Sequence, residues 1–183
     1  MSSHHIIRED QEPALLIMDS HAIPFEHVQE LLEWSPTVIV VEEAIPNVMS
    51  WGIKIDVVIA DASNIADLTS TLHEQFPLKL ISFNTCEEAL STALYFLIAA
   101  RQKAVNILSL QPLESFEPFT AIDLSVFQYG KRWSFIRSGV YEKWLPAERA
   151  IHVYPADNDS TIKTQRDGVI VIKRETGFWV AEE

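Results

Sequence analysis

The chain of 183 residues contains a single cysteine and only five glycines. One cysteine excludes an internal disulfide framework. Among the first 122 residues Gly52 is the sole glycine, so this part lacks a glycine-rich loop whose backbone N–H groups could surround a phosphate. Basic residues are also scarce, because 14 Lys and Arg stand against 26 Asp and Glu and give a net charge of −12. That charge argues against a nucleic-acid partner and suits cations, metal–phosphate complexes or a cationic heterocycle.

Long apolar runs are absent as well. The longest uninterrupted run, 93–100, is far shorter than the roughly 20 residues that cross a bilayer. The N-terminal segment MSSHHIIRED has no apolar core of the signal-peptide type. We therefore expect a soluble, cytoplasmic protein with no membrane partner. The histidines show no metal-ligand spacing and are interpreted as structural or solvated.

Two short apolar runs each end at an acidic residue. TVIVV at 37–41 is followed by Glu42, and DVVIA at 56–60 is followed by Asp61. Such β-branched runs are typical of buried parallel strands. Ligands of open α/β sheets bind outside the carboxyl ends of the strands. The sequence therefore predicts that Glu42 and Asp61 meet at one edge of a parallel sheet and form a site there.

Strand and helix patterns alternate along the first 122 residues, which predicts a parallel sheet with crossover helices. The expected strands are 14–19, 37–42, 55–60, 78–82 and 104–110, and the expected helices are 25–32, 65–76 and 87–102. Asn64 with Asp67, and Thr85 with Glu88, have the spacing of helix-capping residues. The last helix is apolar on nearly every face, so we expect it to be buried under the sheet.

After Ile122 the pattern changes to short strands separated by turn signals. The strand candidates are 123–129, 132–137, 150–154, 161–165, 169–173 and 178–181. The sequence thus predicts an α/β fold with two domains: a parallel-sheet α/β domain over 1–122 and a small β-sandwich domain over 123–183. Because the second domain is small, its apolar residues are expected to pack against the first domain or a second subunit. The segment 111–118 has no assigned structure.

This order of segments resembles the thiamin pyrophosphokinase family. In that family Asp-Gly-Gly follows the second strand, where this chain has Glu42, Glu43 and Ala44. Gly-Asp-Phe-Asp-Ser follows the third strand, where 60–64 is ADASN and keeps the first acid as Asp61. Thr-Asp precedes a helix that opens E-x-A-L. Asn84-Thr85 replaces the Thr-Asp, whereas 87–90, EEAL, matches the helix opening, and LQPLES at 110–115 does not match the family's Arg, Asp-His segment.

The resemblance implies ATP-dependent pyrophosphoryl transfer to thiamin, giving thiamin diphosphate and AMP, in a homodimer with Mg²⁺. Glu42 and Asp61 would hold the metal, and Asp61 would be catalytic. The implied nucleotide-binding residues are Glu43, Ser63, Asn64, Asn84 and Thr85. The implied substrate-binding residues are Trp144 and Trp179, since a tryptophan face can stack on a cationic ring.

The same residues have structural interpretations. Glu42 and Asp61 can be solvated carboxylates at strand ends, and both tryptophans can be core or interface residues. Ser63, Asn64 and Thr85 can be helix caps, and Cys86 is interpreted as a buried or idle thiol. Two functions therefore stay open: a divergent enzyme, and a non-catalytic relative that serves as a ligand-binding or dimeric interaction module. The missing acids and glycines favour the second.

Overall fold

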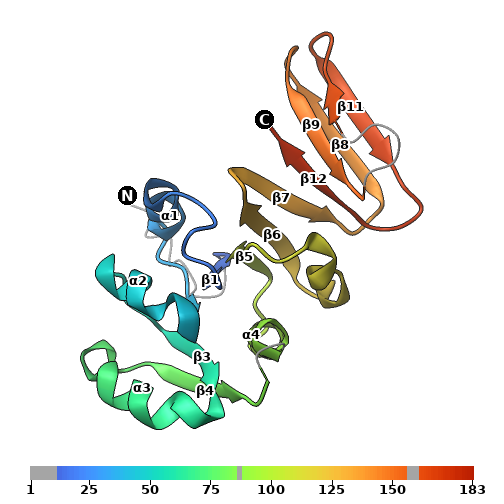
Figure 1. The fold of residues 1–183 in the computed structure, drawn as a ribbon. Coiled ribbons are helices and arrows are strands. Elements are labelled where there is room, and N and C mark those ends of the chain that lie inside the picture. Colours follow the sequence, from blue (N-terminus) through green and yellow to red (C-terminus); the bar gives the residue numbers. More distant parts are fainter. Residues whose placement is uncertain (1–11, 86–87, 156–160) are drawn as a thin grey trace, which may run out of the picture.

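The computed structural model describes residues 12–85, 88–155 and 161–183. Ten strands form one sheet in the order β10-β9-β12-β7-β6-β5-β1-β2-β3-β4, and β11 and β8 form a second, two-stranded sheet (Figure 1). The predicted fold class, a parallel α/β region followed by an antiparallel β region, is confirmed. No helix among the described residues is long and apolar enough to cross a membrane.

The parallel region follows the predicted alternation of strands and helices. Its strands are β1 (Ala14–Ile17), β2 (Val38–Val41), β3 (Val57–Asp61), β4 (Lys79–Phe83), β5 (Ala104–Leu108) and β6 (Asp123–Gln128). Its helices are α1 (Phe25–Leu32), α2 (Ile45–Ser50), α3 (Ile65–Thr71) and α4 (Ala89–Ala99), with 3₁₀ segments η1 (Glu42–Ala44), η2 (Ala62–Asn64), η3 (His73–Gln75) and η5 (Leu113–Phe119). Strands β1 and β2 are buried along their whole length, as expected for strands covered on both faces.

The order of the strands creates a topological switch point. The chain runs from β1 through β2 and β3 to β4 on one side, and then crosses over to β5 and β6 on the other side. All of these neighbours pair in parallel, so their carboxyl ends lie at one edge of the sheet. The strand order reverses between β1 and β5, which is where ligand sites form in folds of this kind.

The antiparallel region continues the same sheet and adds a second layer. Its strands are β7 (Lys131–Ile136), β8 (Val140–Leu145), β9 (Ala150–Tyr154), β10 (Thr161–Lys163), β11 (Gly168–Lys173) and β12 (Phe178–Glu182). Tyr141, Leu145 and Ile172 of the β8–β11 sheet pack against Phe178 and Val180 of the large sheet. Strand β6, expected to begin the second domain, pairs in parallel with β5. The two proposed domains, 1–122 and 123–183, therefore share one sheet.

Several element predictions need correction. Strand β8 was not expected, because in VYEKWL the apolar residues fall in adjacent pairs and do not alternate. The helix predicted at 65–76 divides into α3 and η3, and η5 begins within the segment 111–118 and ends one residue after it. Helix α4 ends before Arg101, whose φ of 61° is not helical. Cys86 and Glu87 lie outside the described residues.

Helix α4 is also less enclosed than its composition predicts. Its buried residues are Ala89, Leu90, Ala93, Leu94 and Leu97. Tyr95, between these positions in sequence, is 62% exposed. A helix that packs on one side of a sheet buries only the stripe that faces the strands, so the outward apolar residues stay at the surface.

Trp179 and Trp144 provide a direct test of the core. Trp179 has no exposed surface and its ring lies 6.2 Å from that of Phe116 and 5.0 Å from that of Phe135, whereas Trp144 is 58% exposed. We expect Trp179→Ala to lower the free energy of unfolding by about 3–5 kcal/mol and Trp144→Ala to change it by less than about 1 kcal/mol. Urea unfolding of both variants measures this difference. Equal losses would contradict the assignment of Trp179 to the core.

Candidate functional site

Glu42 and Asp61 lie side by side at the carboxyl ends of two adjacent strands. Strands β2 and β3 pair in parallel, with Val41 opposite Ile59. Asp61 is the last residue of β3, and Glu42 follows β2 directly as the first residue of η1. The backbone N–H of Asp61 donates to Glu42 Oε2 at 3.0 Å. The structure thus brings the two acids together in the predicted arrangement, while their metal and catalytic roles stay predictions.

Short hydrogen bonds fix the turn that follows Asp61. Asp61 Oδ1 accepts from the Ser63 backbone N–H at 2.8 Å and from Ser63 Oγ at 2.6 Å. Asn64 Nδ2 donates to Glu42 Oε2 at 3.2 Å. Asn64 stands at the N-cap position of α3, as predicted, but its side chain makes no capping hydrogen bond, and its amide donates to Glu42 instead. The 3₁₀ segment η2 precedes α3, and its N-cap residue is Asp61. The Asp61 carboxylate accepts from the Ser63 N–H, one of the backbone N–H groups left unpaired at the start of η2.

These contacts also set the charge of Asp61. The Ser63 hydroxyl, followed by the Ser63 backbone N–H, lowers the pKa of the Asp61 carboxyl below its usual 3.8, because both hydrogen bonds favour the ionised form. Asp61 is therefore a carboxylate at neutral pH. A carboxylate with a lowered pKa is a weak proton acceptor and is better suited to hold a cation.

Asn84 and Thr85 lie one strand farther along the edge. Asp61 is opposite Phe83 in the β3–β4 pair, so Asn84 follows at the same edge. The Asn84 N–H donates to Glu88 Oε2 at 3.2 Å, and the Glu88 N–H donates to the Thr85 carbonyl at 2.8 Å. The expected Thr85–Glu88 capping box is therefore incomplete: Glu88 reaches back to residue 84, and no side chain of the described residues caps the first turn of α4.

A hollow of about 490 Å³ lies at the switch point. It is bordered by the residues that follow β1, β2 and β5 and by the start of α4. Its polar side chains are Asp19, Glu43, Ser109 and Gln111, and no Lys, Arg or His of the described residues lines it. Glu43, predicted to bind a nucleotide, thus stands at this hollow. The wall carries negative charge only, so an anionic ligand would have to bring its own cation.

Sequence reasoning missed Asp19, Ser109 and Gln111. Asp19 has the same signal as Glu42 and Asp61, because the apolar run ALLIM ends at it. The Asp19 N–H donates to the Leu108 carbonyl at 3.0 Å, which ties the end of β1 to the end of β5. Ser109 is 1% exposed and its Oγ accepts from the Gln111 N–H at 3.1 Å. No local pattern identifies this last pair, since only the crossover to β5 brings it to the hollow.

The carboxylate oxygens of Glu42 and Asp61 decide whether Mg²⁺ fits this site. Among the described residues, no group of three or more His, Cys, Asp or Glu side chains could hold a metal ion. The hydrogen bonds occupy Glu42 Oε2 and Asp61 Oδ1, and within the described part of the chain none uses the other oxygen of either carboxylate. Mg²⁺ commonly takes one or two carboxylates and completes its octahedron with water and phosphate oxygens. Glu42 and Asp61 fit that minimal set and do not form an all-protein cage.

Neither predicted substrate-binding tryptophan lies near Asp61 within one chain. Trp179 belongs to β12, which is six strand positions from β3 in the sheet, about 29 Å at ~4.8 Å per strand. Trp179 is enclosed in the core, where its Nε1 has no hydrogen-bond partner among the described residues. Trp144 lies on the outward face of β8, opposite Val169 of β11. Its exposed ring is available to a ligand or to another subunit.

Comparison with known proteins identifies the fold. No family model matches the chain, and no curated protein matches its sequence. A thiamine pyrophosphokinase structure from Bacillus subtilis aligns with a TM-score of 0.63 at 10% identity, covering 94% of this chain and 99% of that chain. The Candida albicans thiamin pyrophosphokinase aligns with a TM-score of 0.58 at 9% identity, covering 96% of this chain and 90% of that chain. The Geobacillus thermodenitrificans thiamin pyrophosphokinase aligns with a TM-score of 0.55 at 11% identity, covering 93% of each chain. At these identities the likeness establishes the fold alone.

Removing the Ser63 hydroxyl tests the hydrogen bonds at Asp61. We expect Ser63→Ala to raise the pKa of Asp61 toward 3.8, because the larger of its two stabilising contacts is lost while the backbone N–H stays. A folded-state pKa below the unfolded one adds stability above the unfolded pKa that is lost as pH falls through the folded value. Ser63→Ala therefore shrinks the acid-side loss of stability.

Carboxyl ¹³C NMR from about pH 2 to about pH 6 measures the Asp61 pKa in both proteins. Ser70→Ala on α3 is the matched control, because the Ser70 hydroxyl donates to the Ala66 carbonyl and not to Asp61. An Asp61 titration that does not move in Ser63→Ala would refute the assigned cause.

Proposed function

We propose that this chain is a thiamin pyrophosphokinase-like protein that transfers a pyrophosphoryl group from ATP to thiamin, giving thiamin diphosphate and AMP, in the cytoplasm. The observation that supports this most is the Glu42–Asp61 pair, joined at the carboxyl edge of β2 and β3. The fold, which is similar to thiamin pyrophosphokinases over most of the chain, makes this edge the natural place for the reaction.

The proposed reaction has a simple balance. The hydroxyl oxygen of thiamin forms a bond to the β-phosphorus of ATP, the bond from that phosphorus to the α–β bridging oxygen breaks, AMP leaves, and the hydroxyl proton passes to solvent. Catalysis of such a transfer rests on alignment and on neutralising charge. Mg²⁺, when bound with ATP, supplies that neutralisation.

The chain's own residues would position the reactants. Asp61, ionised at neutral pH, would hold the metal-bound phosphates through the oxygen that the turn leaves free, with Glu42 beside it. Glu43 would line the adjoining hollow. The nucleotide contacts proposed at the same edge come from Ser63, Asn64, Asn84 and Thr85.

We also propose a homodimer. The outward face of the β8–β11 sheet carries exposed apolar side chains, namely Val140, Trp144, Val169 and Val171. Within one chain this sheet lies at the end of the fold far from β3, the strand that ends at Asp61 (Figure 1). A substrate bound at Trp144 would reach the strand-end acids only if a second subunit brought its own edge to that face.

A non-catalytic relative is the second candidate. It is favoured by the engagement of both carboxylates in the turn, since Glu42 Oε2 and Asp61 Oδ1 already accept hydrogen bonds from that segment. The hollow has no basic side chain, and Gly52 is the only glycine in the parallel region. A protein with these features would keep the fold as a ligand-binding or dimeric interaction module.

A coupled assay for AMP distinguishes the two candidates. With ATP, thiamin and Mg²⁺ we expect AMP release. Its rate should fall about 100-fold in Asp61→Asn, because one of the two carboxylates that would hold the Mg²⁺ on the phosphates is lost. Asp67→Asn on the first turn of α3 is the control and should keep its activity. No AMP release together with a thermal shift from Mg²⁺–ATP would support the binding module. Neither turnover nor shift would remove both substrate assignments.

Sedimentation velocity at micromolar concentration tests the dimer. We expect a dimer that dissociates in Trp144→Glu, because a buried carboxylate on the β8–β11 face would lack a partner. Trp34→Glu is the matched control, since Trp34 is 62% exposed and lies after α1, outside that face. A monomeric native chain, or equal dissociation of both variants, would refute this interface.

A further inference from the structure

A second hollow, of about 350 Å³, lies between helix α1 and the β6–β7 hairpin. Its apolar wall is formed by Ile23 and Leu31 on one side and Phe127 on the other, and Arg132 borders it. It shares no lining residue with the hollow at the switch point. Its volume lies within the roughly 300–1,000 Å³ range of small-molecule sites.

Arg132 is a cation without a carboxylate partner. Its guanidinium lies over the Phe127 ring, 5.6 Å from the centroid, and Nη2 donates to Ser125 Oγ at 3.3 Å. No ion pair between described residues includes Arg132. By contrast, Arg137, the residue directly after β7, forms an ion pair with Asp123 at 3.0 Å. Several other Lys and Arg side chains also make no ion pair with a described residue, so what distinguishes Arg132 is its place over the Phe127 ring at the border of the hollow.

Two carboxylates border the hollow, and only one of them is engaged by other side chains of the described residues. Glu182 also borders the hollow, but it accepts from Lys143 Nζ at 2.7 and 2.9 Å and from the Tyr141 hydroxyl at 2.7 Å. Glu30 borders the hollow from α1, on the wall opposite the hairpin, and makes no ion pair with a described residue. Its charge would direct an anionic group away from α1 and toward Arg132.

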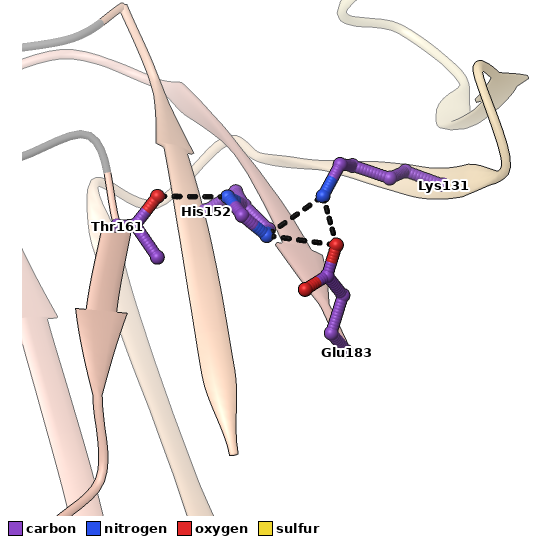
Figure 2. A network of polar contacts seen from close by, with 4 residues as sticks. All are labelled: Lys131, His152, Thr161 and Glu183. Atoms are coloured by element: carbon purple, nitrogen blue, oxygen red, sulfur yellow. Dashed lines mark hydrogen bonds and ion pairs between the residues drawn. The ribbon is translucent and has the colours of Figure 1, made fainter. Parts of the chain in front are cut away.

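Lys131 does not compete with Arg132 for an anion. Lys131 also borders the hollow, but its Nζ forms an ion pair with Glu183 and contacts His152 Nε2 at 2.8 Å (Figure 2). His152 in turn contacts Thr161 Oγ1 through Nδ1 at 2.9 Å. This network occupies the Lys131 ammonium, so on the hairpin side of the hollow the Arg132 guanidinium is the charged donor that stays available. His27 borders the hollow from α1.

We propose that this hollow binds a small organic anion that combines one carboxylate with one apolar ring. The carboxylate accepts hydrogen bonds from the Arg132 guanidinium, whose planar donors match a carboxylate and are held in place by the Phe127 ring. The ring of the ligand packs against Phe127, Leu31 and Ile23 and is removed from water. This site is independent of the reaction proposed at the strand ends.

Benzoate is the probe, with benzyl alcohol and benzylamine as its neutral and cationic counterparts. In ¹H–¹⁵N NMR titrations of the full chain we expect benzoate to shift the Gly130 amide and the Arg132 side-chain N–H signals. Its affinity should exceed that of the other two compounds by about tenfold or more, as charge-assisted hydrogen bonds require. Equal binding of all three compounds, or no benzoate binding at millimolar concentration, would overturn the proposal.

Two variants and one control locate the site. We expect Arg132→Gln to weaken benzoate about tenfold or more, Leu31→Trp to abolish binding by filling the hollow, and Arg137→Gln to bind as the native chain does. Circular dichroism checks that each variant is folded. Should Leu31→Trp fail to fold, Arg132→Gln decides, because Arg132 is exposed and its replacement leaves the core intact. Undiminished binding in Arg132→Gln would refute the site.

Discussion

Parallel pairing of fully buried strands is the constraint on which the rest of the structure depends. The side chains of β1 and β2 are enclosed on both faces of the sheet. Their backbone groups must therefore pair within the sheet, and a polar side chain along these strands would be buried without water. Polar residues can appear only where the strands end. Because the neighbours run in parallel, these ends gather at one edge, and Asp19, Glu42 and Asp61 meet there through the topology of the sheet.

Glu42 and Asp61 also stabilise the turn that follows β3. Glu42 Oε2 accepts from the Asp61 N–H and from the Asn64 amide, which joins the end of β2 to the turn after β3. Asp61 begins that turn by accepting from Ser63. A hydrogen bond to an ionised acceptor is stronger than one between neutral groups, so these contacts favour the folded turn. Retention of these two acids is therefore explained by stability alone as readily as by chemistry, which is why both candidate functions share one site.

The sequence allowed the fold class and the strand-end pair to be predicted, because both depend on local patterns that a parallel sheet makes unambiguous. Strand β8 escaped detection because it covers the sheet at the outside of the fold, where Glu142 and Trp144 face solvent and the burial pattern does not alternate. The hydrogen-bond partner of the Asn64 amide could not be predicted, because that partner, Glu42, is 22 residues away. The place of Ser109 at the hollow required the crossover from β4 to β5, which no motif announces.

Charge divides the molecule into regions with different partners. A net charge of −12 makes two copies repel each other at most surfaces, so association needs a face that is apolar and locally neutral. The outward face of the β8–β11 sheet has that character, since Glu142 is opposite Val171 and Lys173 is opposite Val140, which places one acid and one base among the exposed valines. The same negative field opposes free anions at the switch-point hollow, where every charged side chain is acidic. Arg132, which makes no ion pair with a described residue, stands instead beside the second hollow, against the Phe127 ring.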